Sequence, residues 1–483
     1  LDISPADPDI VYAIVEAQDD KGGFFRSTDA GATWKKMSDY NASSPQYYHE
    51  IVCDPKDPDR VYSLDTFLHV TEDGGKTFDR VPIDHKHVDD HALWIDPADT
   101  DHILVGCDGG IYETFDRATT WDFKANLPVT QFYKIAIDDD FPFYHVYGGT
   151  QDNNTIGGPT ATHSASGIHN YDWFITLGGD GFEPAVEPGD PDIVYSQWQY
   201  GNLARFDRKS GEVVDIQPQP EKGEVLKWNW SSALIISPHD PARLYYGANK
   251  LFRSDDRGDS WVKVSGDLTR GIDRNQLEVM GRVWSVDAVS KNRSTSFYGN
   301  IVSLSESPLV EGLLYAGTDD GLVQVKEGEA EWRKEDDFDK VPEMSYVSML
   351  LASLHAPDRV YATFDNHKKG DFTPYVLRSD DRGRSWKNIA GDLPARGTVY
   401  AIAEDHENQD LLFVGTEFGV FFTVDGGRKW IQLKGGIPTI ACRDLDIQRR
   451  ENDLVVGTFG RGYWVLDDYS PLRRLSDLSL IHI

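Results

Sequence analysis

The stretch FRSTDAGATW, residues 25–34, contains the pattern that decides the fold of this chain. A Ser or Thr is followed by Asp two residues later, by Gly two residues after that, and by Trp or Phe three residues further on. The pattern returns as VTEDGGKTF, FRSDDRGDSW, LRSDDRGRSW and FTVDGGRKW, at residues 70–78, 252–261, 377–386 and 422–430. A catalytic site is not copied this often along one chain, so the repetition favours a structural role.

Each position of the pattern has a structural task. The Asp carboxylate can accept hydrogen bonds from backbone N–H groups of its own turn. Gly supplies a positive φ that other residues resist, and the aromatic residue can pack between neighbouring sheets. We therefore predict that six aspartates fasten turns between strands: Asp29, Asp73, Asp116, Asp256, Asp381 and Asp425. Ala118 stands where Gly is expected in the turn of Asp116, which predicts a strained or altered turn there.

A second recurrence precedes the first along the chain. SPADPDIVYAIV, DPKDPDRVYSL and EPGDPDIVYSQ, at residues 4–15, 54–64 and 187–197, each read as a strand end, an acidic Pro turn and a strand. Taken together, the two recurrences give four short strands in roughly 40–50 residues, which is the blade of an all-β β-propeller. About ten such units open near Leu1, His49, His91, Phe132, Gly181, Ser231, Ile301, Ser345, Thr398 and Ile440.

Composition excludes several classes of partner. The 483 residues carry a formal net charge of -32, which repels nucleic acid and anionic membrane surfaces. The three cysteines, Cys53, Cys107 and Cys442, are far apart and predict neither a disulfide framework nor a CxxC metal site. No apolar run approaches the roughly 18 residues that span a bilayer. We expect no nucleic-acid partner, no membrane insertion, no metal and no cofactor.

The motifs resemble the Asp-box, or BNR, repeat when it recurs in phase. With GTQDN, IISPHDP and VVGTFGRGYWVLDD, the chain resembles the bacterial Asp-box propellers grouped with the sortilin/Vps10 N-terminal domain and with xyloglucanase-like glycosyl hydrolases. The resemblance implies a secreted protein with two propellers in tandem. Residues 1–130 would then end a first propeller, residues 131–475 would form a complete seven-bladed second one, and residues 476–483 would be a non-native or disordered tail. A single ten-bladed ring is the alternative.

Candidate functional residues lie in the loops that face a propeller's channel. Loops that enter the innermost strand, and loops that join the second and third strands, open on this face. Glycoside hydrolysis needs two carboxyl groups roughly 5–9.5 Å apart, and the candidate catalytic residues are Asp152, Asp180 and Asp90. The candidate ligand-binding residues are His87, His91, Asp108, Gln151, Asn153, Trp198, Trp230 and Glu417. The spacing of the histidines matches no metal-site signature, so no metal ligand is assigned.

Two functions fit these residues. The first is an extracellular or periplasmic propeller that binds a polysaccharide, or a peptide or protein ligand, on its channel face. The second is a glycoside hydrolase that acts on a β-linked polysaccharide through paired carboxylates. A hydrolase predicts two facing carboxyls, one of them desolvated with a raised pKa, and a binding protein does not.

Overall fold

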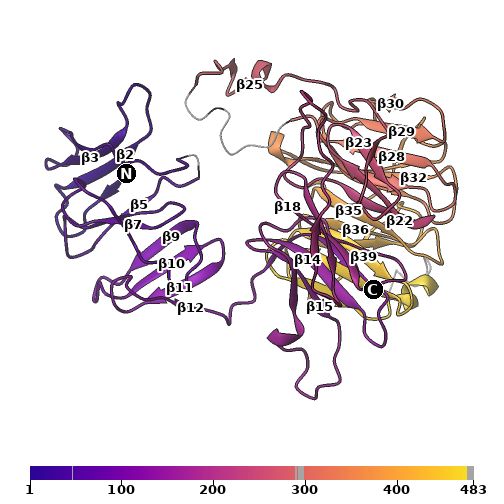
Figure 1. The fold of residues 1–483 in the computed structure, drawn as a ribbon, viewed down its shortest axis with the longest axis horizontal. Helices are drawn as coiled ribbons and strands as arrows, with labels where there is room; N and C mark the ends of the chain where they lie inside the picture. Colours follow the sequence, from indigo (N-terminus) through magenta and orange to yellow (C-terminus); the bar gives the residue numbers. More distant parts are fainter. Residues whose placement is uncertain (46, 289–290, 292–297, 476–483) are drawn as a thin grey trace. The chain divides into compact units, whose positions relative to one another are not determined.

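A computed structural model describes residues 1–45, 47–288, 291 and 298–475. The chain divides into two compact units, each described by itself below (Figure 1). Unit 1 comprises Leu1–Pro128 with Asn275–Thr295, and unit 2 comprises Val129–Arg274 with Ser296–Ile483. The predicted tail at 476–483 lies outside the described residues, and the prediction that unit 1 ends a longer propeller stays a prediction.

The described residues of unit 1 form three four-stranded antiparallel sheets, each with its strands in sequence order. The sheets are β1 (Asp2–Ile3), β2 (Val11–Val15), β3 (Gly23–Ser27) and β4 (Lys35–Ser38); β5 (Ile51–Cys53), β6 (Val61–Ser63), β7 (His69–Thr71) and β8 (Asp79–Arg80); and β9 (Asp90–Ile95), β10 (Ile103–Cys107), β11 (Gly110–Thr114) and β12 (Asp122–Phe123). A two-stranded hairpin follows the short 3-10 helix η2 (Arg274–Gln276) and consists of β25 (Glu278–Val279) and β26 (Arg282–Val283). Buried clusters around Tyr12 and Tyr62 hold neighbouring sheets together.

Unit 2 contains six four-stranded sheets and a three-stranded one among its described residues. The first three sheets are β13 (Gln131–Ile137), β14 (His145–Gln151), β15 (Thr155–Pro159) and β16 (Phe174–Leu177); β17 (Ala185–Val186), β18 (Ile193–Trp198), β19 (Asn202–Asp207) and β20 (Val213–Asp215); and β21 (Leu234–Ser237), β22 (Asp240–Gly247), β23 (Leu251–Ser254) and β24 (Val262–Lys263). The others are β27 (Ile301–Glu306), β28 (Leu313–Thr318), β29 (Val323–Glu327) and β30 (Arg333–Glu335); β31 (Tyr346–Ala352), β32 (Val360–Asn366), β33 (Asp371–Ser379) and β34 (Lys387–Asn388); β35 (Val399–Glu404), β36 (Leu412–Thr416), β37 (Gly419–Thr423) and β38 (Ile431–Gln432); and β39 (Cys442–Gln448), β40 (Asp453–Thr458) and β41 (Tyr463–Leu466). Short 3-10 helices are η1 (Asn170–Asp172), η3 (His367–Lys369) and η4 (Ser470–Arg474).

The seven sheets of unit 2 close into a ring. The first strand of each sheet contacts the first strand of the next, in the order β13, β17, β21, β27, β31, β35 and β39. β39 and β40 return to β13, and a backbone bridge between Gln131 and Phe459 joins the last sheet to the first (Figure 1). The structure confirms the predicted β-propeller, because each sheet is a blade and each first strand lines the centre.

Recurring glycines allow neighbouring blades to pack closely. A Cβ at Gly317 would lie 2.5 Å from Val347, and a Cβ at Gly415 would lie 2.5 Å from the backbone oxygen of Cys442, each in the next blade. A Cβ at Gly457 would lie 2.9 Å from Ile135 and would disturb the contact that closes the ring. A side chain at these second-strand positions would push the neighbouring inner strand away.

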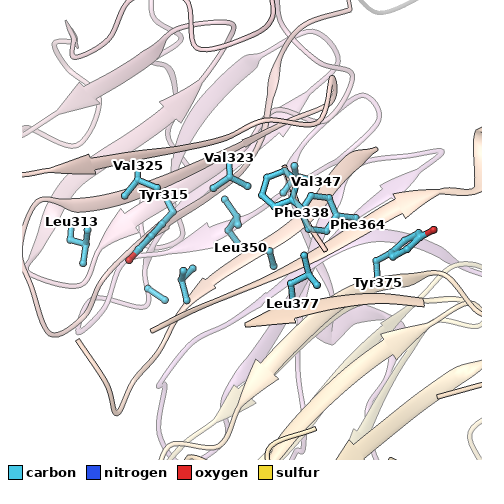
Figure 2. Packing of buried hydrophobic residues seen from close by; sticks show 13 residues of the cluster. Leu313, Tyr315, Val323, Val325, Phe338, Val347, Leu350, Phe364, Tyr375 and Leu377 are labelled. Carbon is cyan, nitrogen blue, oxygen red and sulfur yellow. The ribbon is translucent and has the colours of Figure 1, made fainter. Parts of the chain in front are cut away.

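Apolar side chains between blades form the core. Figure 2 shows one such layer, where Leu313 and Tyr315 of β28 face Val347 and Leu350 of β31 in a buried cluster. Inward-facing positions alternate along each strand with outward-facing ones, so two blades bury their sides against each other. Each blade therefore depends on its neighbours for its core.

The last blade departs from the expectation of four strands. After β41 the chain turns at Tyr469 into η4, and no fourth strand follows within the described residues. Tyr469 donates a hydrogen bond of 2.6 Å to Asp405, and Arg473 donates one of 2.7 Å to the same carboxylate. This buried anchor ties the segment to the preceding blade and replaces strand pairing.

The recurring aspartates fasten their own turns. Asp29 accepts hydrogen bonds from the backbone N–H of Thr33 at 2.8 Å and from its hydroxyl at 2.6 Å, and Ser27 donates another at 2.7 Å. The same backbone bonds recur at Asp73, Asp116, Asp256, Asp381 and Asp425. Ala118 takes the left-handed conformation with φ 65°, and its N–H still reaches Thr114 at 3.2 Å. The turn is strained there, but its hydrogen bonds are kept.

The segment at 265–300, which is long for a loop between blades, leaves unit 2 and returns to it. Asn275–Thr295 groups with unit 1, and the residues on either side group with unit 2. Gln18 of unit 1 donates a hydrogen bond of 3.2 Å to the backbone oxygen of Asp287. Residues 289–290 and 292–297 of this segment lie outside the described part of the chain.

Candidate functional site

Inner strands of unit 2 carry a bulge at one shared position. In β13 the pairing with β14 jumps from Phe132 to Lys134, which leaves Tyr133 as the extra residue. The same jump leaves Tyr400 in β35 and Arg443 in β39 unpaired. A bulge bends the strand and re-aims the side chain of its extra residue, and bulges are frequent beside functional sites. The channel face of unit 2 therefore includes Tyr133, Tyr400 and Arg443.

Aromatic rings form a continuous row on this face. Ring centroids are 5.8 Å apart for Phe459 and Tyr133, 4.9 Å for Tyr133 and Phe182, 5.9 Å for Phe182 and Trp230, and 4.9 Å for Trp230 and Tyr200. We call these five residues the aromatic row. Phe182 is buried, and Tyr200, at the far end, is 38% exposed. The buried ring of Phe182 thus lies in the middle of the row, between half-buried Tyr133 and Trp230.

Arg443 lies beside Phe459, the half-buried end of the aromatic row. Its guanidinium carbon is 4.5 Å from the ring centre of Phe459 and 3.9 Å from that of Tyr400. A cation over an aromatic face is attracted by the ring's quadrupole. These contacts hold the guanidinium plane in one orientation, and the hydroxyl of Tyr400 donates to Glu417.

Carboxyl groups with altered acidity surround the channel. Burial raises the pKa of Glu183 to about 7 and that of Asp319 to about 7. Asp319 accepts hydrogen bonds from the backbone and side-chain nitrogens of Asn300, at 2.7 and 3.0 Å. Burial also raises the pKa of Tyr346, and the carboxylates of Asp319, Asp365 and Glu183 raise it further. Carboxylates from different blades are therefore close enough to Tyr346 to raise its pKa.

The candidate residues of β14 and its following loop lie close to Tyr133. The side-chain oxygen of Gln151 accepts hydrogen bonds from Gln131, at 3.0 Å, and from the Tyr133 hydroxyl. Burial raises the pKa of Tyr133, and Asp180 and Asp152 raise it further, so both carboxylates lie near this ring. Asp180 is almost fully buried, and its Oδ1 has no hydrogen-bond partner among the described residues.

The other candidates of unit 2 either contact residues of the channel face or hold the local backbone in place. Trp230 belongs to the aromatic row, and Glu417 accepts a hydrogen bond from the Tyr400 hydroxyl. Trp198 ends β18 and packs on Gly179, where a Cβ would lie 3.0 Å from its own. The backbone oxygen of Asn153 accepts a hydrogen bond of 2.6 Å from Thr150, which fixes the loop.

His87, Asp90, His91 and Asp108 lie in unit 1 and form their own arrangement. His91 Nε2 is 3.0 Å from Asp108 Oδ1, and the imidazole lies 4.9 Å from the ring of Tyr48. His91 is the extra residue of the bulge between β9 and β10, the position that Tyr133 holds in unit 2. The His87 ring packs against Gly109.

The prediction that Asp90 is a catalytic residue was wrong. Its side chain is completely buried and forms an ion pair of 2.5 Å with the equally buried Lys86. A carboxylate enclosed in this way contacts no substrate. Sequence reasoning missed Lys86 because it belongs to no repeated motif and directly precedes the candidate His87.

A cluster with the ligand types of a metal site already contains a protein cation. The ligand atoms of Asp138, Asp140 and His145 lie within 4.8 Å of one another. Arg208 donates a hydrogen bond of 2.7 Å to Asp140, and its Nη1 is 3.8 Å from Asp138. This guanidinium supplies the positive charge that the carboxylates need.

Sequence reasoning missed the residues that lead the inner strands. Tyr133, Phe182, Tyr400 and Arg443 stand at the entry of a strand, where no repeated motif marks them. A usable signal exists in the second strand, because a Gly-Thr pair lies opposite the bulge in β36 and β40. Two residues of the inner strand pair with this Gly and Thr, and the residue between those two is the one that the bulge leaves unpaired.

The fold and this channel face define a β-propeller. A family model described as sortilin, neurotensin receptor 3, matches residues 22–150. A xyloglucanase, Xgh74A of Acetivibrio thermocellus, is 23% identical over 269 residues, which cover 50% of this chain and 30% of the relative. The oligoxyloglucan-reducing end-specific xyloglucanase of Emericella nidulans is 26% identical over 329 residues, which cover 63% of this chain and 37% of the relative.

Among solved structures, the GH74 xyloglucanase from Xanthomonas campestris matches at 17% identity and a TM-score of 0.28, covering 96% of this chain and 78% of that one. The extracellular domain of a putative hybrid two-component system from B. thetaiotaomicron gives 13% identity and a TM-score of 0.48, covering 94% and 55%. By sequence, the chain is therefore similar to sortilin over residues 22–150 and to xyloglucanases over a larger part of its length. The chain spans about a third of the curated relatives, at 30% and 37% of their lengths. No helix among the described residues is long and apolar enough to cross a membrane.

Proposed function

We propose that the channel face of unit 2 binds a glycan. The observation that carries this proposal is the aromatic row, which ends in the exposed ring of Tyr200 beside Trp230. Flat rings pack against the apolar faces of sugars, while hydroxyl, amide and carboxylate groups nearby bind sugar hydroxyls. Gln151, Asp152 and Glu417 supply such groups on the same face.

The similarity to xyloglucanases supports a polysaccharide as the ligand class, and the match to the sortilin model supports a peptide as the competing one. We favour the glycan because the face presents a row of aromatic rings that meet tilted or edge to face, and aromatic rings pack against the apolar faces of sugars. We also propose an extracellular or periplasmic location, because a polysaccharide ligand lies outside the cell.

A specific observation favours hydrolysis as the second candidate function. Glu183 and Asp319 both have a pKa near 7 because of burial, which is the condition of a general acid at neutral pH. Asp152 and Asp180 would supply the second carboxyl group. Activity therefore requires one protonated and one ionised carboxyl on the same sugar-sized surface.

Binding of xyloglucan oligosaccharides to the whole chain tests the proposal by titration calorimetry. We expect the Trp230→Ala variant to bind about ten-fold more weakly or worse, since buried aromatic anchors dominate such contacts. Trp34→Ala is the matched control, because Trp34 is exposed in a turn of unit 1. A peptide library that binds while every oligosaccharide fails would contradict the glycan proposal.

Release of reducing ends distinguishes binding from hydrolysis. Turnover that falls at least ten-fold in Asp152→Asn, Asp180→Asn or Glu183→Gln would establish the enzyme. Tight binding without any released reducing end would establish the binding protein.

A further inference from the structure

We infer that the glycan bound by unit 2 carries a carboxylate, held by Arg443. This inference rests on the proposed function and names the ligand's chemical class. A chain of neutral sugars that contains a single uronic acid fits the charges of the site.

Arg443 is a partly buried arginine without an anionic partner. Arg208, Arg359 and Arg473 are also partly buried, and each lies 2.7 Å from a carboxylate oxygen. Arg443 forms no ion pair or hydrogen bond with the described part of the chain, and its buried Nε is unbonded. A buried donor that stays unbonded costs free energy, which a ligand acceptor would recover.

The guanidinium of Arg443 is prepared for a planar anion. Tyr400 and Phe459 hold it at 3.9 and 4.5 Å from their ring centres, so its N–H edge keeps a fixed direction. A fixed guanidinium binds a carboxylate through two parallel hydrogen bonds, and little side-chain entropy is lost. Tyr400 itself is engaged with Glu417, so it does not compete for the ligand's carboxylate.

The aromatic row links this cation to the sugar-binding surface. Phe459 contacts both the guanidinium and Tyr133, and the row continues from Tyr133 to Trp230. A glycan that lies along the row would therefore place one of its rings at Arg443. The carboxyl of a uronic acid projects from the edge of such a ring, toward the guanidinium.

Surrounding charges limit the ligand to few carboxylates. Glu183, Asp319 and Asp365 act on Tyr346, which Arg443 also approaches, and the whole chain has a formal net charge of -32. A polyuronate with a charge on each sugar would be repelled by these groups. A mostly neutral glycan places its single carboxylate at the Arg443 guanidinium and avoids that repulsion.

The test compares a xylo-oligosaccharide that bears one methylglucuronic acid with the same molecule after its carboxyl has been reduced. Calorimetry on the whole chain should show the acidic form binding about ten-fold more tightly or better, because hydrogen bonds to charged groups exceed neutral ones. Arg443→Gln should remove that preference. Arg449→Gln, at an exposed arginine of the same strand's end, should keep it.

The outcomes separate this inference from the proposed function. If both sugars bind the native chain equally, the inference fails and the glycan proposal stands. If neither sugar nor neutral xyloglucan binds, both fail. The comparison on the native chain holds even if Arg443→Gln does not fold, which a thermal unfolding scan would reveal.

Discussion

Two aspartates of the same blade, Asp90 and Asp116, illustrate how environment, not residue type, decides a role. Asp90 is enclosed with Lys86, and burial raises its pKa. Asp116 lies on an open turn, where hydrogen bonds from Thr120 lower its pKa to about 2. Sequence spacing predicted the Asp116 turn, because its partners are within four residues along the chain. The burial of Asp90 depends on Tyr112 and Trp121, which pack around Lys86 from elsewhere in the blade.

Replacing Lys86 with Met should destabilise unit 1 by about 3–5 kcal/mol, because Asp90 would become a buried charge without a partner. Denaturant unfolding measures the change. The double variant Lys86→Met with Asp90→Leu is the control and should recover most of the stability, since an apolar pair can replace a buried ion pair. A loss below about 1 kcal/mol in the single variant would show that Asp90 is solvated.

Acid should destabilise unit 1 through its turn aspartates. Hydrogen bonds from Thr33 lower the pKa of Asp29 to about 2, and those from Thr120 do the same for Asp116. Because each folded pKa lies below the unfolded value, the stabilisation is complete above about pH 4 and is lost as the pH falls towards about 2. Melting temperatures across this range should fall for the native chain and fall less for Asp116→Asn. Parallel curves for the two proteins would contradict the assignment.

The strands could be predicted from the repeats, but the irregularities of those strands could not. The Asp turns and the Pro turns bracket each strand, so the blades could be predicted from the sequence. The bulges at Tyr133, Tyr400 and Arg443 could not, because a bulge depends on the neighbouring strand's register. The position of η4, the last described element after β41, likewise depends on Asp405, a residue of the preceding blade.

Gly415→Ala should destabilise unit 2 by about 1–3 kcal/mol, because its Cβ would meet the backbone oxygen of Cys442 at 2.5 Å. Gly106→Ala is the matched control at the same position of β10, where the nearest atom to a new Cβ is 3.6 Å away. That control should be neutral or slightly stabilising, since Gly weakens a strand. Thermal unfolding compares the two, and an equal loss in both would refute the packing explanation.

Closure of the blades of unit 2 into a ring brings together residues that the sequence alone does not connect. The repeat predicts that blades exist, and the ring of unit 2 then follows from the contact of β39 and β40 with β13. The candidate site joins Tyr133 of the first blade, Trp230 before the third and Arg443 of the last. Residues this far apart along the chain meet only because the ring closes, so Gln151, Asp152 and Trp230 could be proposed from their loops, and Arg443 could not.

We propose that unit 2 binds its ligand on the channel face and that its repeated aspartates serve only to fasten turns. A crystal structure of the chain with a bound xyloglucan oligosaccharide tests it most directly. We predict sugar rings packed against Trp230 and Tyr200, with the next ring directed toward Arg443. An oligosaccharide seated on the Asp turns, or in the groove lined by Gln217, Trp261 and Lys263, would contradict the claim.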